Sequence, residues 1–258
     1  MSRLRAKCPD CLTFTAVAMG PDYQCHSCGR EWASGLVRVP RAWGDGGEAM
    51  AASAALPLSF PEAAVIEEPT LGEQNLVLAT ELPERPVVLG GCCCSHVGAI
   101  EGLAARHDRL AVVWLDAHGD LNTAETSPSG NLWGMPLRMA IDSGAVDPGD
   151  VALIGARNLD PPEEEFITRT GIHTSDDAAD RALDGVSCVY VALDCDVLDE
   201  GEVPSFMPEP GGLSVDEVDT LFKRLSRQAT VVGAGLTGLR PEPLSIGPLE
   251  RLTASLGL

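Results

Sequence analysis

Short apolar runs alternate with stretches of mixed polarity from about residue 85 onward. Each run is continuous and has the length of a strand. The runs are PVVLGG (86–91), LAVVWLD (110–116), DVALIGAR (150–157), VSCVYVALD (186–194) and ATVVGAG (229–235). Continuous apolar strands need cover on both faces, and parallel sheets obtain it from the helices between their strands. The pattern therefore predicts a three-layer α/β/α fold with a mostly parallel sheet.

Two of the intervening stretches are predicted to be helices, SHVGAIEGLAARH (95–107) and SVDEVDTLFKRLSRQ (214–228). The second begins with Ser214, and Glu217 follows three residues later. A serine and a glutamate at this spacing form a capping box, in which each side chain bonds the backbone of the other residue. We therefore expect a helix to start at this serine.

The first 41 residues have a different character. Four of the nine cysteines form CPDC (Cys8, Cys11) and CHSC (Cys25, Cys28), with 13 residues between the two pairs. Paired C-x-x-C knuckles can direct four thiolates at one tetrahedral Zn²⁺, a reading that we favour over disulfides in an intracellular chain. Residues 1–41 are therefore predicted to be a zinc ribbon with a closed, structural site. A redox dithiol pair is the alternative.

Composition divides the chain further. The segment 42–60 is rich in Gly, Ala and Pro and is predicted to be a linker, which leaves 61–258 as the main domain. The formal charge is −20; residues 1–41 contribute six basic and three acidic residues, or +3, so the remainder carries −23. This acidic body argues against general binding to nucleic acid. Because no signal peptide or membrane span is recognisable, we expect a cytoplasmic protein without a membrane partner.

The strand at 110–116 ends in an unusual group of polar residues. It runs into Asp116, His118 and Asp120, and the strand at 186–194 runs into Asp194 and Asp196. The carboxyl ends of parallel strands meet at one edge of a sheet, so these groups are expected to lie together. Crowded carboxylates repel each other unless a cation binds them. Oxygen donors with one imidazole favour a divalent metal such as Mn²⁺, although solvated loop acids are the alternative.

Several segments resemble motifs of the ureohydrolases, the arginase–agmatinase family. DAHGDLNT and DCDVLD are similar to its two signature motifs. SPSGNLWGMP resembles its Ser-Gly-Asn loop, GARNLDPPEEE its Arg-Asp-x-Asp-Pro segment, and PEPGGLS its Gly-Gly-Leu helix entry. The resemblance covers residues 85–245 and leaves the zinc ribbon outside. It implies an arginase/deacetylase-like fold, a homo-oligomer and a small guanidino or amidino substrate.

The resemblance also implies a two-metal centre. Asp116 and Asp194 would bridge both ions, Asp120 would ligate one ion, and His118 and Asp196 would ligate the other. Mn²⁺ is the first expectation, with Zn²⁺, Fe²⁺ or Ni²⁺ as alternatives. In the implied reaction a metal-bridging hydroxide attacks the C–N carbon, and Asp120 passes a proton to the leaving amine. Asp120 and His118 are therefore the catalytic candidates.

One ligand of the family has no direct counterpart. The family places a histidine in a GGDHS motif, and here the sequence reads GGCCCSHVGAI. An ungapped count puts Cys93 at the ligand position and keeps GAIEGL in register, whereas a two-residue insertion puts His96 there. We favour Cys93, whose thiolate would shift the metal preference toward zinc, iron or nickel.

The substrate-binding residues match the family in part. Trp133 stands where arginases usually have a proton-shuttling histidine; an indole can instead form a pocket wall or stack on a cationic substrate. Asn158 replaces an aspartate of the family. The residues that resemble its contacts to the α-carboxylate and α-amino groups of an amino acid are Asn122, Ser129, Asn131 and Asp160.

The most consequential departure concerns the guanidinium group. The family carries an acidic residue three positions before a proline of its last strand, and GLTGLRP has Gly238 at that position. Glu242 is near but lies on the other side of Pro241. Guanidinium recognition is therefore either rearranged through Glu242 or replaced by recognition of another amidine, amide or urea-like group.

The sequence thus predicts a binuclear metal-dependent hydrolase that cleaves a C–N bond of a guanidino or amidino compound. Two alternatives stay open. One is a single-zinc deacylase of the same fold, which the paired DCD motif disfavours. The other is a non-catalytic regulatory or scaffold homologue that uses the zinc ribbon to bind a partner, whose identity the sequence does not indicate.

Overall fold

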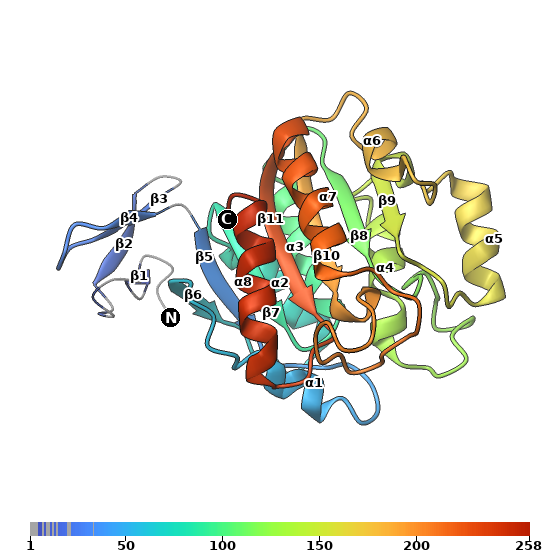
Figure 1. Ribbon diagram of the computed structural model, residues 1–258, viewed down its shortest axis with the longest axis horizontal. Helices are drawn as coiled ribbons and strands as arrows, with labels where there is room; N and C mark the ends of the chain where they lie inside the picture. The colour runs from blue at the N-terminus through green and yellow to red at the C-terminus, as the bar shows by residue number, and fades with distance from the viewer. Residues whose placement is uncertain are drawn as a thin grey trace.

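The computed structural model describes residues 5–6, 8, 11, 13, 15–19, 22–32 and 34–258. Its main part is a seven-stranded sheet in the order β6-β5-β7-β11-β10-β8-β9 (Figure 1). Every neighbouring pair in this sheet is parallel. The strands are β5 (Ser34–Val39), β6 (Glu62–Val65), β7 (Arg85–Gly90), β8 (Ala111–Leu115), β9 (Val151–Ile154), β10 (Cys188–Asp194) and β11 (Thr230–Thr237). The five predicted strands and the parallel α/β class are confirmed.

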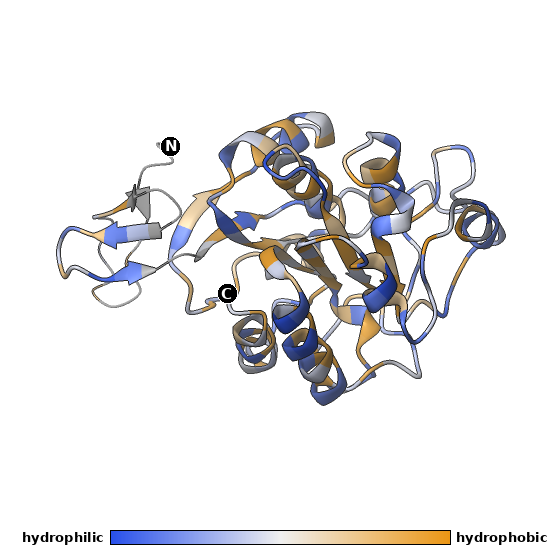
Figure 2. Ribbon diagram, turned by 90° about the horizontal axis from the view of Figure 1, so that it is seen from above, coloured by the Kyte–Doolittle hydropathy of each residue, from blue (hydrophilic) through white to orange (hydrophobic). Residues whose placement is uncertain are grey.

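Helices cover both faces of this sheet. One face is covered by α2 (Leu71–Glu81), α3 (Cys94–Ala104) and α4 (Pro136–Asp142), and Phe166 of α5 (Pro161–Thr170) packs into the same cluster. The other face is covered by α6 (Ala178–Ala182), α7 (Val215–Gln228) and α8 (Ile246–Ser255). Figure 2 shows the apolar sheet between these two layers, with the polar sides of the helices outward. The arrangement is the predicted three-layer sandwich.

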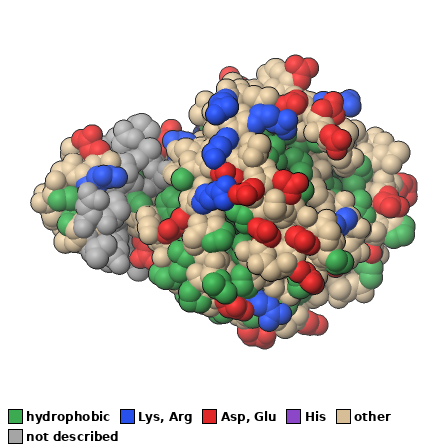
Figure 3. Space-filling view, in the orientation of Figure 1, with side chains coloured by type: hydrophobic (Ala, Val, Ile, Leu, Met, Phe, Trp, Pro, Cys, Tyr) green, Lys and Arg blue, Asp and Glu red, His purple; other side chains and the backbone are tan. Residues whose placement is uncertain are grey.

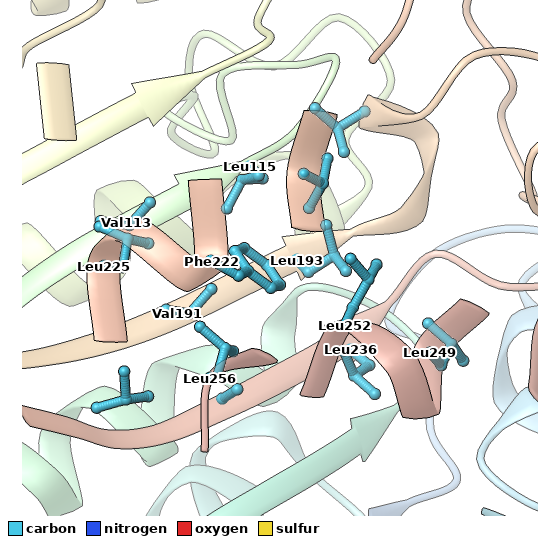
Figure 4. Packing of buried hydrophobic residues seen from close by; sticks show 14 of the residues in the cluster. Val113, Leu115, Val191, Leu193, Phe222, Leu225, Leu236, Leu249, Leu252 and Leu256 are labelled. Carbon is cyan, nitrogen blue, oxygen red and sulfur yellow. The ribbon is translucent and has the colours of Figure 1, made fainter. Parts of the chain in front are cut away.

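Alternate residues of the central strands feed the two cores. In β8, Val113 and Leu115 face the α7–α8 side, whereas Val112 and Trp114 face the α2–α4 side. Phe222 of α7 is fully buried at the centre of the first cluster (Figure 4). Because every residue of such a strand is buried on one face or the other, its sequence reads as a continuous apolar run.

The helix α7 starts as the sequence predicts. Ser214 is its N-cap and accepts a hydrogen bond from the backbone N–H of Glu217, while the Glu217 carboxylate accepts one from the backbone N–H of Ser214 at 2.8 Å. A second capping box, between Asp160 and Glu163, starts α5, with Pro161 at the first helical position. Both caps satisfy backbone N–H groups that the helix itself leaves unpaired.

A separate four-stranded antiparallel sheet carries the N-terminal cysteines, with Cys25 at the end of a strand and the other three between strands, and is drawn beside β5 and β6 in Figure 1. Its strands are β1 (Arg5–Ala6), β2 (Ala16–Met19), β3 (Asp22–Cys25) and β4 (Glu31–Trp32). The sulfurs of Cys8, Cys11, Cys25 and Cys28 all lie within 4.8 Å of one another. Four thiolates 2.3 Å from one tetrahedral zinc ion would lie about 3.8 Å apart. The cluster is therefore compatible with a small zinc site, although other parts of the predicted ribbon, residues 1–4 included, lie outside the described residues.

The predicted ribbon boundary at residue 41 does not coincide with the observed sheets. Ser34–Val39 pairs along its whole length with β7 and is a strand of the main sheet. Its apolar run, GLVRV, is covered on both faces, with Leu36 in one core and Val37 in the other. The segment 42–60, predicted to be a linker, contains the short helix α1 (Glu48–Ser53). In the part of the chain that the structure describes, no helix is long and apolar enough to span a membrane.

Candidate metal centre

The predicted acidic residues meet at the carboxyl edge of the sheet. Asp116 follows β8 and Asp194 ends β10, and these two strands are paired side by side, with Leu115 opposite Leu193. Cys93 is the N-cap residue of α3, which follows β7, and β11 alone separates β7 from β10 in the sheet. Three separate connections therefore bring donor groups to one place, as expected for a parallel α/β sheet.

The donor atoms form two overlapping groups. In the first, single ligand atoms of Cys93, Asp116 and Asp120 lie within 4.8 Å of one another, and in the second the same holds for Asp116, His118 and Asp196. Asp194 lies beside both groups, because its Oδ2 accepts a hydrogen bond from the Cys93 thiol at 2.8 Å and its Oδ1 accepts one from the Asp196 backbone N–H at 3.0 Å. The carboxylate of Asp116 is shared by the two groups.

The four carboxyl groups are buried close together. Asp116, Asp120, Asp194 and Asp196 are each at most 8% exposed. Burial, together with the charge of Asp196, raises the pKa of Asp194 to about 7. Burial and the charge of Asp116 raise the pKa of Asp196 to about 6. Buried anions of like charge are costly, so the geometry needs either protons or cations to neutralise it.

Asp120 is held in an unusual backbone conformation. Its φ of +51° makes it the one non-glycine residue with a positive φ in the described part of the chain. Its Oδ2 is buried and has no hydrogen-bond partner among the described residues. The preceding Gly119 has no room for a side chain, because a Cβ would lie 2.7 Å from Glu163 Oε1. Strain of this kind persists where the surroundings enforce it and is concentrated at functional sites.

His118 points one ring nitrogen at the carboxylates. Its Nδ1 lies 3.1 Å from Asp196 Oδ2 and 3.5 Å from Asp116 Oδ1. Its Nε2 lies 3.7 Å from Glu209 Oε1. Burial lowers the pKa of His118, but the bonds to Asp116 and Asp196 outweigh this effect and raise it overall. Nδ1 therefore faces the two carboxylates that would share a cation with it.

The structure separates the two candidates for the remaining donor. Cys93 lies in the carboxylate cluster, with Asp116 Oδ2 3.9 Å from its sulfur. His96 is turned away: its Nδ1 lies 3.0 Å from the Tyr190 hydroxyl and its Nε2 lies 3.1 Å from Thr237 Oγ1. Burial lowers the pKa of His96 to about 3, so its ring is neutral. His96 is thus not among the donors that the fold brings together, because both of its nitrogens are occupied in the core.

A cavity of about 260 Å³ opens over these groups. Four of the residues predicted to bind substrate line it, namely Asn122, Ser129, Trp133 and Asp160. Two others do not. The Asn131 Oδ1 accepts a hydrogen bond from the Asp45 backbone N–H at 2.9 Å, and Glu242 is exposed at the start of a 3₁₀ turn (Pro243–Ser245). Neither residue lines the cavity, and their role as substrate contacts stays a prediction.

Gly238 lines the cavity without offering an acid. Its φ is +69°, and a Cβ built on it would collide with the carboxylate of Asp194. The position therefore requires glycine in this arrangement. Glu242, the acid predicted as a replacement, is not among the residues that line the cavity. The cavity keeps the donor groups but lacks the acid at this point.

The polar wall of the cavity is fixed by internal hydrogen bonds. Asn122 donates from Nδ2 to Asp160 Oδ2 at 2.8 Å and accepts from the Thr126 hydroxyl at 2.9 Å. Asn158, which also lines the cavity, donates to Glu209 Oε1 at 3.0 Å. These bonds hold the amide and carboxylate groups in place before any ligand binds.

Sequence reasoning missed the apolar wall. Met50, Cys92, Phe206 and Met207 line the cavity, and the Phe206 and Trp133 rings pack edge to face at 6.1 Å. Phe206 and Met207 precede the PEPGGLS motif, so proximity in sequence was the available signal. Met50 lies in the predicted linker, where no periodic pattern marked it.

Comparison with known proteins places this geometry in a family. The arginase family model matches residues 63–255. The arginase of Bacillus subtilis (strain 168) is 35% identical over 194 residues, which cover 65% of this chain and 66% of that protein. The arginase of Bacillus caldovelox is 33% identical over 183 residues, which cover 60% of this chain and 61% of that protein. The matched region thus spans less than two thirds of these relatives.

Solved structures agree on the fold. The crystal structure of arginase from Bacillus subtilis aligns with a TM-score of 0.70 at 24% identity, covering 87% of this chain and 98% of that one. The family match and the seven-stranded parallel sheet lead to the same conclusion. The chain belongs to the arginase family.

Proposed function

We propose that the protein is a hydrolase that uses two divalent metal ions to cleave a C–N bond of a guanidino or amidino compound. The observation that carries this proposal is the pair of donor groups that overlap at Asp116. Two groups that share one buried carboxylate are suited to two neighbouring cations rather than to one. The family membership supports the same reaction class.

The residues fit such ions. Asp120 has a buried oxygen without a partner among the described residues, which a cation would satisfy. Cys93 and Asp120 would hold one ion, His118 and Asp196 the other, and Asp116 and Asp194 both. When bound, two such ions would supply a water of lowered pKa and would polarise the carbon under attack. The thiol of Cys93 adds a soft donor, so zinc, iron or nickel competes with manganese at this centre.

Asp120 is the residue proposed to move the proton. Burial, reinforced by the charges of Asp116 and Asp194, raises its pKa well above the usual range. With one carboxylate oxygen on a cation, the other oxygen of Asp120 would accept a proton and return it to the leaving amine. Asn122 and Asp160, whose positions are fixed by their mutual hydrogen bond, are proposed to orient the polar end of an amino-acid-like substrate.

The four cysteines of the N-terminal sheet are proposed to hold one structural Zn²⁺. Their sulfurs include the pairs Cys8–Cys28 and Cys11–Cys25, each 3.5 Å apart. Four thiolates complete a tetrahedral shell, so this ion would be closed to substrate.

Metal analysis combined with a substrate screen tests the proposal. We expect two equivalents of metal in the carboxylate centre beside one ribbon zinc, and release of urea or ammonia from a guanidino, amidino or ureido compound. One equivalent in the centre would favour the single-zinc deacylase. Absence of turnover in protein that holds both ions would contradict the proposed hydrolase activity. An Asp116→Asn variant that loses metal but still binds a partner protein would favour the non-catalytic scaffold.

A further inference from the structure

The segment Arg41–Met50, called here the N-terminal wall, contacts the cavity from outside the region that matches the arginase family, which begins at residue 63. Met50 lines the cavity directly and is 4% exposed. Trp43 packs in one apolar cluster with Cys92, Trp133 and Phe206, which line the cavity too. This wall therefore lies outside the residues that the family model matches.

Backbone bonds connect the wall to the loop that carries Trp133. The Leu132 N–H donates to the Trp43 carbonyl at 2.9 Å, and the Asp45 N–H donates to Asn131 Oδ1 at 2.9 Å. These two bonds join the wall and the loop on either side of Gly44. The residues immediately before Trp133 are thus held by the N-terminal wall.

Gly44 provides the space in which the indole lies. A Cβ built on Gly44 would lie 2.5 Å from Trp133 Cε3 and 2.6 Å from its Cη2. Gly47 is also restricted, since its Cβ would lie 2.6 Å from the Cβ of Ala42 and 3.0 Å from Trp133 Cζ3. Contacts below 3.0 Å force a shift, and the ring also packs edge to face against Phe206. A side chain at position 44 would therefore move the indole.

The same wall reaches the turn that carries Cys93. The Trp43 N–H donates to the Cys92 sulfur at 3.4 Å. A side chain at Gly91 would collide with the Arg41 carbonyl oxygen. The Gly91 N–H donates to the Val39 carbonyl at 3.0 Å. The Trp43 indole N–H donates to Gln74 Oε1 at 2.8 Å, which anchors the wall to the buried side of α2. The wall is a braced part of the fold rather than a free connection.

We propose that the N-terminal wall determines the substrate specificity of this chain by fixing Trp133 through Gly44. This inference rests on the proposed function, because it assigns specificity to the same cavity. The fixed indole, with Met50 and Phe206, adds apolar groups to a cavity that the polar residues Asn122 and Asp160 also line. The substrate class is then a C–N compound that has an apolar part and a polar end.

A Gly44→Ala variant tests this inference. The added methyl group is expected to push the indole toward the cavity and raise KM for the best substrate of the screen by roughly 10- to 100-fold, the range that one methylene produces in a tight pocket. Metal content should change little, because the donor groups are untouched. The variant should weaken binding of the substrate and of the transition state equally, which raises KM and leaves kcat nearly unchanged. Gly72→Ala in α2 is the matched control, because a Cβ there meets no described atom within 4 Å.

A double variant separates positioning from general damage. Trp133→Phe removes the ring atoms that would collide with the methyl group added at position 44, so Gly44→Ala should have little further effect on KM in that background. The indole N–H signals of ¹⁵N-tryptophan-labelled protein give a readout without substrate, and Trp133→Phe identifies the signal of Trp133. Gly44→Ala should shift that signal and leave the one from buried Trp114, which donates to Asp116, in place.

The two proposals fail in distinguishable ways. If Gly44→Ala shifts the Trp133 signal but the protein turns over no compound of the screen, the N-terminal wall positions Trp133 and the proposed hydrolase activity is contradicted. An unshifted signal would overturn the wall, and so would an unchanged KM or effects of Gly44→Ala and Trp133→Phe that simply add. Loss of metal in Gly44→Ala would also overturn it, since the wall would then act on the donor groups instead of on Trp133.

Discussion

Two replacements occur beside the same carboxylate. The Cys93 thiol donates a hydrogen bond to Asp194 Oδ2, and a side chain at Gly238 would collide with the Asp194 carboxylate. The resemblance to the family implies a neutral imidazole at the first position and an acid at the second. If Cys93 binds the proposed ions as a thiolate, it adds a negative charge on the metal side and thereby offsets the acid that is absent at Gly238.

The first prediction concerns the metal preference that Cys93 confers. A Cys93→His variant should bind Mn²⁺ more tightly relative to Zn²⁺ than the unaltered protein does, because an imidazole replaces a soft thiolate. With the ribbon zinc left in place, Co²⁺ in the carboxylate centre should give a sulfur-to-cobalt charge-transfer band that Cys93→His and Cys93→Ser abolish. A band that survives both variants would show that the thiolate donor is not Cys93.

A second prediction concerns pH. Burial raises the pKa of Asp194 to about 7 and that of Asp196 to about 6, whereas an aspartate in the unfolded chain has a pKa near 4. Between these values the folded protein without metal binds more protons than the unfolded chain, so its stability falls as the pH rises from about 4 to about 7. The Tm of protein without metal in the carboxylate centre should therefore be higher at about pH 5.5 than at about pH 8.

Metal should remove this dependence, because cations then neutralise the carboxylates and bind the deprotonated form. The stabilisation on adding metal should be larger at the higher pH. Asp194→Asn is the control, and its Tm without metal should vary less between the two pH values. A Tm that rises with pH in the unaltered protein without metal would contradict the assigned direction.

At the residue scale, the sequence predicts the location of a side chain where that side chain stands at the end of a recognisable strand. Asp116 and Asp194 could be brought together from sequence because each follows a strand of a parallel sheet. The choice between Cys93 and His96 needed the structure, because it depends on whether Tyr190 and Thr237 are at hand to bind the imidazole. The outward position of Glu242 likewise depends on the path of the chain after Pro241.

Among the elements, α7 shows how a helix stabilises the edge that carries the site. Phe222 is fully buried against Val191 and Leu193 of β10, the strand that ends in Asp194 (Figure 4). Hydrogen bonds connect the charged side of α7 to α8: Arg251 of α8 donates to Asp219 of α7 at 2.7 Å, and Ser255 donates to the same carboxylate. The hydrogen bond from Lys223, with those from Ser255 and Arg251, holds the pKa of Asp219 below its usual range.

The third prediction follows from this packing. Phe222→Ala should lower the free energy of unfolding by about 3–5 kcal/mol, through lost apolar contacts and the cavity left behind. Urea unfolding followed by circular dichroism measures it. Phe222→Leu, which keeps most of the volume, should cost less than about 1.5 kcal/mol. Similar costs for the two variants would mean that the ring is not packed as described.

The strands differ in how well they could be predicted. β8 and β10 are long, apolar and bounded by polar residues, so their patterns were sufficient. β5 carries the same kind of run, GLVRV, but it lies close to the cysteine knuckles and was attributed to the ribbon. Its place in the sheet results from pairing with β7, about fifty residues later in the chain, and local patterns contain no information on that pairing.

For the whole molecule, charge distribution complements the proposed centre. Acidic and basic side chains are interspersed over α7 and α8, while acidic ones prevail over much of the face in Figure 3. The body carries a formal charge of −23 against +3 for residues 1–41. A negative field of this kind attracts divalent cations and cationic substrates and opposes anionic ones.

The fourth prediction concerns the N-terminal sheet, in which the described core residues Cys8, Ala16, Tyr23 and Cys25 pack together and touch Ala63 of β6. An ordered unit this small buries little surface to offset its chain entropy, so the proposed zinc is expected to supply the remaining stability. A Cys8→Ser, Cys25→Ser variant should bind one zinc fewer and lose amide hydrogen-exchange protection in β2 and β3. Since β8 and β10 draw their stability from the two large cores, their protection and the metal in the carboxylate centre should persist. Loss of protection in β8 and β10 as well would mean that the ribbon and the sheet fold as one unit, and unchanged zinc content would rule out the four-cysteine site.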